Sequence, residues 1–176
     1  TKEGEANLNK FKQAIALLLT TRGIPQIYYG TEILMYGEKS DGDGNLRKEF
    51  PGGWAGDPIN AFSESGRTAL ENEAWSYMQS LLQWRKGNDA IINGELIHYA
   101  PTWDNECYVY ARIGENNRVL VFLNGSNEEK TLDPYTFRDV IAGYTSGTDV
   151  VTGKEISLTE EITLPAKGSF VLDLTK

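Results

Sequence analysis

Carboxylate and amide side chains alternate in one short stretch of the sequence, at Asp41, Asp43 and Asn45. This spacing is that of the opening of a calcium loop, because oxygen ligands of this kind suit Ca²⁺. The EF-hand pattern also needs a glycine next and a glutamate at its twelfth position, where this chain has Leu46 and Gly52. The EF-hand interpretation therefore fails. Calcium at a site of another type stays open, and the sequence predicts no other cofactor.

The chain has one histidine, His98, and one cysteine, Cys107. Both lie in runs with β-strand character, so we expect a structural histidine and a buried, inert thiol. A single cysteine excludes an internal disulfide and leaves the compartment undetermined. The sequence holds no CxxC zinc pair, no glycine-rich phosphate loop and no Ser/His/Asp arrangement.

The 176 residues carry a net charge of -8, and 40% of them are hydrophobic. This composition is globular, and the length suits one domain or two small ones. An acidic surface repels phosphate backbones and anionic lipids, so we expect neither nucleic acid nor membrane as a partner. A neutral ligand such as a sugar meets no such repulsion. The sequence shows no signal peptide, but it does not begin with Met, so its true N-terminus is expected upstream.

The first 90 residues alternate between helical and strand patterns. Apolar residues at helical spacing predict a helix that ends near Gly23, and the apolar run Ile24–Tyr29 predicts a buried strand of a parallel sheet. Residues 31–67 have no sustained period and are rich in Gly, Asp, Ser and Pro, which indicates a long functional loop. Thr68 and Glu71 then form a capping box that predicts the start of a second helix.

From about residue 91 the pattern changes to short β-branched and aromatic runs separated by turn residues. Such spacing predicts an antiparallel β-sandwich, with a domain boundary near residues 89–94. The expected strands are 96–99, 107–113, 118–123, 137–141, 149–151, 162–164 and 169–174.

Several segments carry a resemblance to a known family. LLLTTRGIPQIYYGTEI at 17–33 resembles the final barrel strand of α-amylase-family glycoside hydrolases, together with the helix before it. RKEFPGGWAGD at 47–57 is similar to the loop that follows in neopullulanase-like and cyclomaltodextrinase-like members. LLQWRKGNDAIINGEL, VLVFLNGS and LPAKGSFVLDL resemble the last barrel helix and strands of the C-terminal β-domain.

The resemblance implies an α/β part followed by an all-β part. Residues 1–90 would be the end of a (β/α)8 TIM barrel, with helix 7, strand 8 and helix 8, and residues 91–176 the antiparallel β-sandwich. Active sites of such barrels lie at the carboxyl ends of the strands, which places the loop 31–67 on the catalytic face.

The family cleaves α-glucosidic bonds with retention, using two carboxyl groups roughly 5 Å apart. The resemblance places these groups on barrel segments that this chain does not contain, so we expect no catalytic residue here. The intact enzyme would act on starch-derived glucans, pullulan or cyclodextrins. This chain would supply one wall of the sugar cleft, with an α-glucan oligosaccharide or polysaccharide and the remainder of the parent enzyme as partners.

Four residues are implied as substrate contacts: Asp43, Arg47, Trp54 and Glu32. Asp43 and Arg47 would hydrogen-bond sugar hydroxyls, and the alternative is a solvated ion pair. Trp54 would stack on a sugar ring or else pack under the loop, and Glu32 would support the site rather than catalyse.

Two other readings remain for the whole chain: a non-catalytic carbohydrate-binding sandwich and a structural module that shields the barrel. Trp103, at the start of the expected sandwich, is expected to pack, with a surface starch site as the alternative. The sequence does not fix linkage specificity or oligomeric state. A lone barrel strand without its neighbours would also leave apolar faces exposed.

Overall fold

The computed structural model describes residues 2–101 and 106–174. It divides into two compact units. The first unit contains the chain up to Ile24 and again from Gln79 onwards, and the second contains Pro25–Met78. The domain boundary expected near residues 89–94 stays a prediction.

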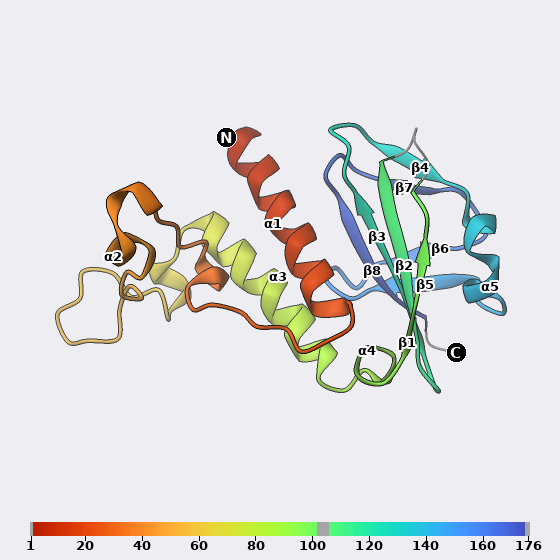
Figure 1. Cartoon of the computed structure of the whole chain (residues 1–176), viewed down its shortest axis with the longest axis horizontal. Coiled ribbons are helices and arrows are strands. Elements are labelled where there is room, and N and C mark those ends of the chain that lie inside the picture. Colours follow the sequence, from red (N-terminus) through yellow and green to blue (C-terminus); the bar gives the residue numbers. More distant parts are fainter. Residues whose placement is uncertain (1, 102–105, 175–176) are drawn as a thin grey trace. The chain divides into compact units, whose positions relative to one another are not determined.

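The first unit is built on a six-stranded antiparallel sheet with the order β1-β2-β3-β8-β5-β6 (Figure 1). Its strands are β1 Glu95–Tyr99, β2 Cys107–Ile113, β3 Arg118–Asn124, β5 Ser146–Asp149, β6 Glu155–Ser157 and β8 Ser169–Leu174. A second layer holds the antiparallel pair β4 Lys130–Leu132 and β7 Ile162–Leu164. The expected antiparallel domain is therefore confirmed.

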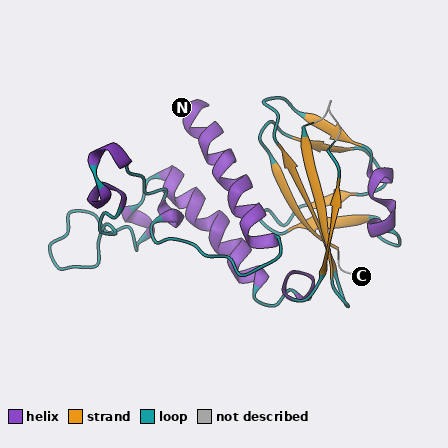
Figure 2. Ribbon diagram, in the orientation of Figure 1, coloured by secondary structure: helices purple, strands orange, loops and turns teal. Residues whose placement is uncertain are grey.

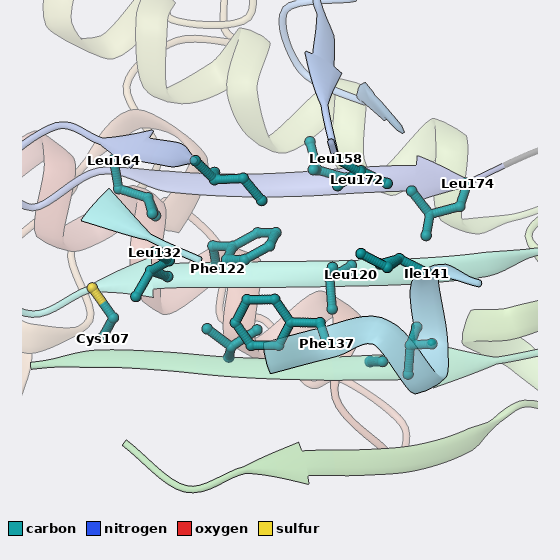
Figure 3. Close-up of a cluster of buried hydrophobic side chains, with 14 residues drawn as sticks. Cys107, Leu120, Phe122, Leu132, Phe137, Ile141, Leu158, Leu164, Leu172 and Leu174 are labelled. Carbon is teal, nitrogen blue, oxygen red and sulfur yellow. The ribbon is translucent and has the colours of Figure 1, made fainter. Parts of the chain in front are cut away.

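The core of this unit lies between its two layers. Alternate residues of the central strands, such as Leu120, Phe122 and Leu172, point to one side and are fully buried (Figure 3). The ring of Phe137 meets that of Phe122 edge to face at 5.4 Å between centroids. Pleating explains the arrangement, because successive side chains of a strand point to opposite faces.

Phe137 does not come from a strand, so the strand expected at 137–141 is wrong. The chain forms the 3₁₀ helix η4 Pro134–Phe137 and the short helix α5 Arg138–Ile141. Asp133 Oδ1 accepts the Tyr135 N–H at 2.9 Å, and Pro134 has the fixed φ that a first helical position prefers. The apolar residues that suggested a strand instead cover the sheet from a helical turn.

Three strands differ from the pattern-based expectation. β4 and β6 were not expected, because each has three residues, of which two are polar, and too few alternations to stand out. The expected strand 149–151 is displaced, since β5 ends at Asp149. The Asp149 carboxylate accepts hydrogen bonds from the Thr152 N–H and hydroxyl, which turns the chain there.

The long helix α1 Lys2–Thr20 packs against β3 and β8 on the face away from that core. Gln13 Nε2 ties it to the sheet by donating to the Asn124 carbonyl at 2.6 Å and the Gly168 carbonyl at 3.1 Å. The buried residues Leu8, Ile15, Ala16 and Leu19 form the apolar stripe of the helix. The helix predicted from this spacing is confirmed.

Arginines from distant elements satisfy the C-terminal carbonyls of α1. Arg85, at the end of helix α3 Ala69–Arg85, donates to the Leu19 and Gly23 carbonyls. Arg112 of β2 donates to the Thr20 carbonyl at 3.0 Å. The last turn of α1 has no basic residue of its own, so these guanidinium groups complement the negative end of its dipole.

Arg112 is 2% exposed and makes two further hydrogen bonds. It donates to the Ile91 carbonyl at 3.0 Å, in helix α4 Asp89–Ile92, and to the Gly94 carbonyl at 2.9 Å. Burial, followed by the charge of Arg85, lowers the pKa of Arg112. The group is thus held by three carbonyls, two of them at or near helix C-termini.

The second unit is mostly loop, as Figure 2 shows for the segment between α1 and α3. Its short turns are η1 Thr31–Ile33, η2 Lys39–Asp41, α2 Asp43–Leu46 and η3 Glu64–Gly66. The predicted capping box is present at the start of α3, where the Thr68 N–H donates to Glu71 Oε2 at 2.6 Å and the Glu71 N–H donates to Thr68 Oγ1 at 3.3 Å.

The strand expected at 24–29 is not formed. These residues are irregular, neither helical nor part of the antiparallel sheet, and Ile24 is 98% exposed. A β-strand is defined by ladder hydrogen bonds to neighbours, and no parallel partner exists among the described residues.

Candidate functional site

The segment after Tyr29 folds back on itself through a glycine turn. Gly30 has φ +82°, in the left-handed region, and a Cβ there would collide with the side chain of Met35. The Gly30 carbonyl accepts the N–H groups of Ile33 at 3.2 Å and Met35 at 2.9 Å. Ile33 is 2% exposed and anchors the turn. The turn thereby brings the tyrosines before Gly30 close to the residues that follow Met35.

These residues enclose a pocket of about 330 Å³, which we call the tyrosine pocket. The Tyr29 hydroxyl donates to the Lys48 carbonyl at 2.8 Å, and Lys48 Nζ donates to the Tyr36 carbonyl at 3.2 Å. Desolvation and the adjacent Tyr28 raise the pKa of Tyr29, so its phenol stays protonated. The lining residues are Tyr28, Tyr29, Thr31, Met35, Tyr36, Gly37, Asn45, Leu46 and Lys48.

A second pocket of about 280 Å³, the tryptophan pocket, lies further along the same loop. Trp54 is 80% exposed, and its backbone N–H donates to Asp57 Oδ2 at 2.9 Å. Gly52 has φ +104°, and a Cβ there would lie 2.6 Å from the Asn60 Cα. The lining residues are Glu49, Phe50, Pro51, Gly52, Trp54, Asp57, Pro58 and Ile59.

Contacts within the unit hold the far end of this loop. The Ala61 N–H donates to the Pro51 carbonyl at 2.8 Å, and Arg67 donates to the Ala61 carbonyl at 2.9 Å and to Asn72 Oδ1 at 2.8 Å. The Arg67 guanidinium also lies 4.2 Å from the ring centroid of Trp75. These contacts therefore hold in place the part of the loop that carries exposed apolar rings.

The four residues implied as substrate contacts all lie in this unit. Asp43 begins α2 and forms an exposed ion pair with Lys39, while Arg47 follows the same helix and is exposed. Glu32 lies in η1 and is half-buried. Only Trp54 lines either pocket. Their contacts with a sugar stay predictions.

Sequence reasoning placed the loop 31–67 on the catalytic face but did not predict which of its residues line the tyrosine pocket. Tyr36, Asn45 and Lys48 are separated by nine and three positions along the chain, a spacing that matches no motif. They meet because of the turn at Gly30 and the short helix α2. The cluster of tyrosines near that glycine was the one available signal.

The calcium candidates bond mainly to their own neighbours. Ser40 Oγ donates to Asp41 Oδ1 at 3.3 Å, Asp43 pairs with Lys39, and Asn45 Oδ1 accepts the Glu38 N–H at 2.7 Å. Across residues 2–101 and 106–174, no group of three or more His, Cys, Asp or Glu side chains is arranged to hold a metal ion.

Several side chains singled out in the sequence lie in the sandwich. His98 is exposed on β1, where its Nδ1 hydrogen-bonds the Tyr108 hydroxyl. Cys107 is buried, and burial raises the pKa of its thiol. The Tyr99 hydroxyl donates to Asp139 Oδ1 at 2.7 Å, and Trp103 lies outside the described residues. None of the described helices has both the length and the apolar character needed to cross a bilayer.

Comparisons with known proteins relate the chain to carbohydrate-active enzymes. Residues 96–173 match the family described as the Cyclo-malto-dextrinase C-terminal domain. An α-amylase of Niallia circulans is 33% identical over 157 residues, which are 84% of this chain and 26% of that protein. A cyclomaltodextrin glucanotransferase of Geobacillus stearothermophilus is 31% identical over 158 residues, covering 85% of this chain and 19% of the relative.

Solved structures show the same fold. An α-amylase of Geobacillus thermoleovorans, complexed with acarbose, superposes with a TM-score of 0.70 at 18% identity, over 96% of this chain and 34% of that one. The cyclomaltodextrin glucanotransferase CldA gives a TM-score of 0.68 at 24% identity, over 96% of this chain and 32% of that one. The chain thus spans about a third or less of the length of these proteins. Its sequence is similar to α-amylase-family enzymes over most of its length, and its residues 96–173 match the Cyclo-malto-dextrinase C-terminal domain.

Proposed function

We propose that the chain is part of a retaining glycoside hydrolase that cleaves α-glucosidic bonds in starch-derived glucans, pullulan or cyclodextrins. In this proposal the chain supplies one wall of the sugar cleft and no catalytic carboxyl group. The observation that carries it is that the loop of the second unit contains two aromatic-lined pockets and is held by hydrogen bonds within the unit. The names of the relatives, α-amylase and cyclomaltodextrin glucanotransferase, support the substrate class.

The same proposal makes residues 1–90 the end of a (β/α)8 barrel. The order of helix α1, the irregular segment 24–29 and helix α3 supports this, because helix 7, strand 8 and helix 8 follow one another in the same order. The segment would join the sheet only when strands from the rest of the enzyme flank it. Ile24 would then lose the 98% exposure that it has here.

Trp54, Asp43 and Arg47 suit a neutral polyhydroxylated ligand. An exposed indole offers an apolar face to the C–H groups of a sugar ring. A carboxylate accepts from two neighbouring hydroxyls, and a guanidinium presents a planar fork of donors. The ion pair of Asp43 with Lys39 lies at the surface and contributes little to stability, so a sugar hydroxyl can replace it at low cost.

Two measurements on the 176-residue chain test this function. The chain alone should release no reducing ends from starch, pullulan or α-cyclodextrin. Measurable release would refute the proposal that the chain holds no catalytic carboxyl group.

Maltoheptaose at millimolar concentration should change the tryptophan fluorescence, and Trp54→Phe should reduce the change. Trp84→Phe is unsuitable as a control, because Trp84 Nε1 donates to Asp173 Oδ2 at 2.7 Å. Trp75→Phe is the control, since a phenyl ring keeps a face for the Arg67 guanidinium that helps to hold the loop. A fluorescence change that survives in Trp54→Phe would contradict the assignment of Trp54.

The alternative is a non-catalytic module, either carbohydrate-binding or structural. The observation that favours it is the extent of the family match, which covers the sandwich alone. That part also has its own closed core. Under this alternative, sugar binding would not respond to changes in residues 25–78.

A further inference from the structure

We propose that Asn124 is a modification site of the unfolded chain: its side-chain amide is lost by deamidation there, and the resulting acid prevents a return to the native fold. Asn124 is the last residue of β3, in the first unit, and so lies apart from the loop proposed to contact sugar. It precedes a glycine, and the sequence has two such pairs, Asn124-Gly125 and Asn93-Gly94.

The chemistry of an Asn-Gly pair supplies the reaction. The backbone nitrogen of the glycine attacks Cγ of the asparagine side chain. The new N–Cγ bond closes a cyclic succinimide, and the Cγ–Nδ2 bond breaks with release of ammonia. Water then opens the ring at either carbonyl and leaves aspartate or isoaspartate. Glycine favours the closure, because it has no Cβ to hinder the approach of its nitrogen.

The native fold restrains both partners of this reaction. Asn124 is fully buried, and its own N–H donates to the Gly168 carbonyl at 2.9 Å. The nitrogen that has to attack belongs to Gly125, whose N–H donates to the Glu106 carbonyl at 3.0 Å. Ring closure would break these hydrogen bonds and turn the chain out of its extended conformation. Deamidation therefore requires that this end of β3 first opens.

The native fold also needs the amide group itself. A side-chain amide supplies two N–H donors and one acceptor oxygen. Nδ2 of Asn124 donates to the carbonyls of Glu128 at 2.8 Å, Pro165 at 2.8 Å and Leu164 at 3.3 Å. Its Oδ1 accepts the Ser126 N–H at 2.9 Å. The side chain thus joins the turn after β3 to the end of β7.

The products of deamidation would not fit this site. Aspartate keeps an acceptor for Ser126 but turns its second oxygen toward the carbonyls that Nδ2 had bonded. A buried charge without a partner is more costly than a lost hydrogen bond. Isoaspartate also adds a methylene to the main chain, which displaces the turn that follows β3. Modified chains would therefore accumulate unfolded, as happens when the unfolded form reacts faster than it refolds.

The second pair provides an internal comparison. Asn93 is exposed just after α4, and its Nδ2 donates to Asp89 Oδ1 at 2.9 Å. The Gly94 N–H donates to the Ala90 carbonyl at 3.1 Å. An aspartate at position 93 loses one surface hydrogen bond, but water solvates its charge. The fold should therefore tolerate deamidation of Asn93 and not that of Asn124.

Peptide mass mapping of the 176-residue chain tests where the reaction occurs. The native chain and the chain unfolded in guanidinium chloride are incubated at the same mildly alkaline pH. In the unfolded chain, Asn124 and Asn93 should be converted at similar rates, since both precede glycine. In the native chain, conversion of Asn124 should be at least about tenfold slower, because it waits for local opening. An equal rate for Asn124 in both samples, or no conversion in the unfolded chain, would overturn the proposal.

Thermal unfolding of two variants tests the consequence. Asn124→Asp should lower Tm by roughly 10 °C, through the lost hydrogen bonds and the buried carboxylate. The matched control, Asn93→Asp, should lower it by no more than about 2 °C. Equal Tm values for the two variants would refute the requirement for the amide at position 124.

Failure of Asn124→Asp to fold would be the extreme form of the expected loss, and refolding of the wild type then decides. Wild-type chain incubated unfolded at mildly alkaline pH is diluted into buffer, and the refolded fraction is mapped. It should carry the intact amide at position 124, with Asn93 converted as often as in the total sample. Acid at position 124 in the same proportion in refolded and total chains would contradict the proposal.

Discussion

Replacing Arg112 by methionine should cost the first unit much of its stability. Methionine has a similar length and no donor, so the substitution leaves the carbonyls of Thr20, Ile91 and Gly94 without the guanidinium. The site is 2% exposed, and water cannot readily replace the lost donors. Three elements, α1, α4 and the start of β1, would lose their common anchor.

The magnitude follows from the number of acceptors. Each buried acceptor left unsatisfied costs about 1–3 kcal/mol, so three cost roughly 3–9 kcal/mol. Part of this is offset, because the variant no longer buries a guanidinium whose Nε has no partner among the described residues. We expect a net loss of about 3 kcal/mol. For a chain of this length that corresponds to a fall in Tm of roughly 6–12 °C.

Urea and thermal unfolding of the variant and the wild type measure this loss. Arg22→Met is the matched control, since Arg22 is an exposed arginine just beyond the same helix end. It should change the free energy of unfolding by less than about 0.5 kcal/mol. An Arg112→Met variant as stable as the control would show that the three hydrogen bonds do not anchor these elements.

Three further predictions concern other parts of the chain. Thr68→Ala should lower the free energy of unfolding by about 1 kcal/mol, because it removes the capping box. The control is Ser76→Ala, at an exposed position of the same helix. Equal unfolding midpoints of the two variants would contradict the capping role of Thr68. Hydrogen bonds from the Asn93 side chain and the Glu115 N–H lower the pKa of Asp89. The ionised carboxylate therefore stabilises the folded chain above its ordinary pKa of 3.8, and this stabilisation is lost as the pH falls through the lowered pKa of the folded state. In Asp89→Asn, the free energy of unfolding should therefore fall less steeply as the pH is lowered below about 4. An unchanged pH dependence would exclude Asp89 as a cause of the acid destabilisation. Cys107 should react with a thiol reagent only after unfolding, because burial raises its pKa, and rapid labelling of the native chain would count against that burial.

Three of the strands expected from the sequence have the same bounds in the structure. The predicted spans 107–113, 162–164 and 169–174 coincide with β2, β7 and β8, because β-branched and aromatic residues there are bounded by turn residues. The segment 137–141 was misassigned, since three apolar residues among five fit a strand or a helical turn equally well. There a local cap at Asp133 decided the outcome.

The strand expected at 24–29 failed for a different reason. Its residue types are those of a buried strand, but a strand needs partners, and the described chain supplies none in parallel. The tyrosine pocket could not be predicted either. Asn45 and Lys48 come close to Tyr29 only through a left-handed glycine and a turn of helix, and neither leaves a periodic signal in the sequence.

The central claim is that the loop of the second unit is a sugar-contacting wall. Backbone amide chemical shifts of the 176-residue chain, followed during a titration with maltoheptaose, test it most directly. We predict shift changes concentrated between Tyr28 and Asp57, with the amides of the sheet from Glu95 onwards unchanged. Changes confined to the sandwich, or no changes at millimolar sugar, would contradict the claim.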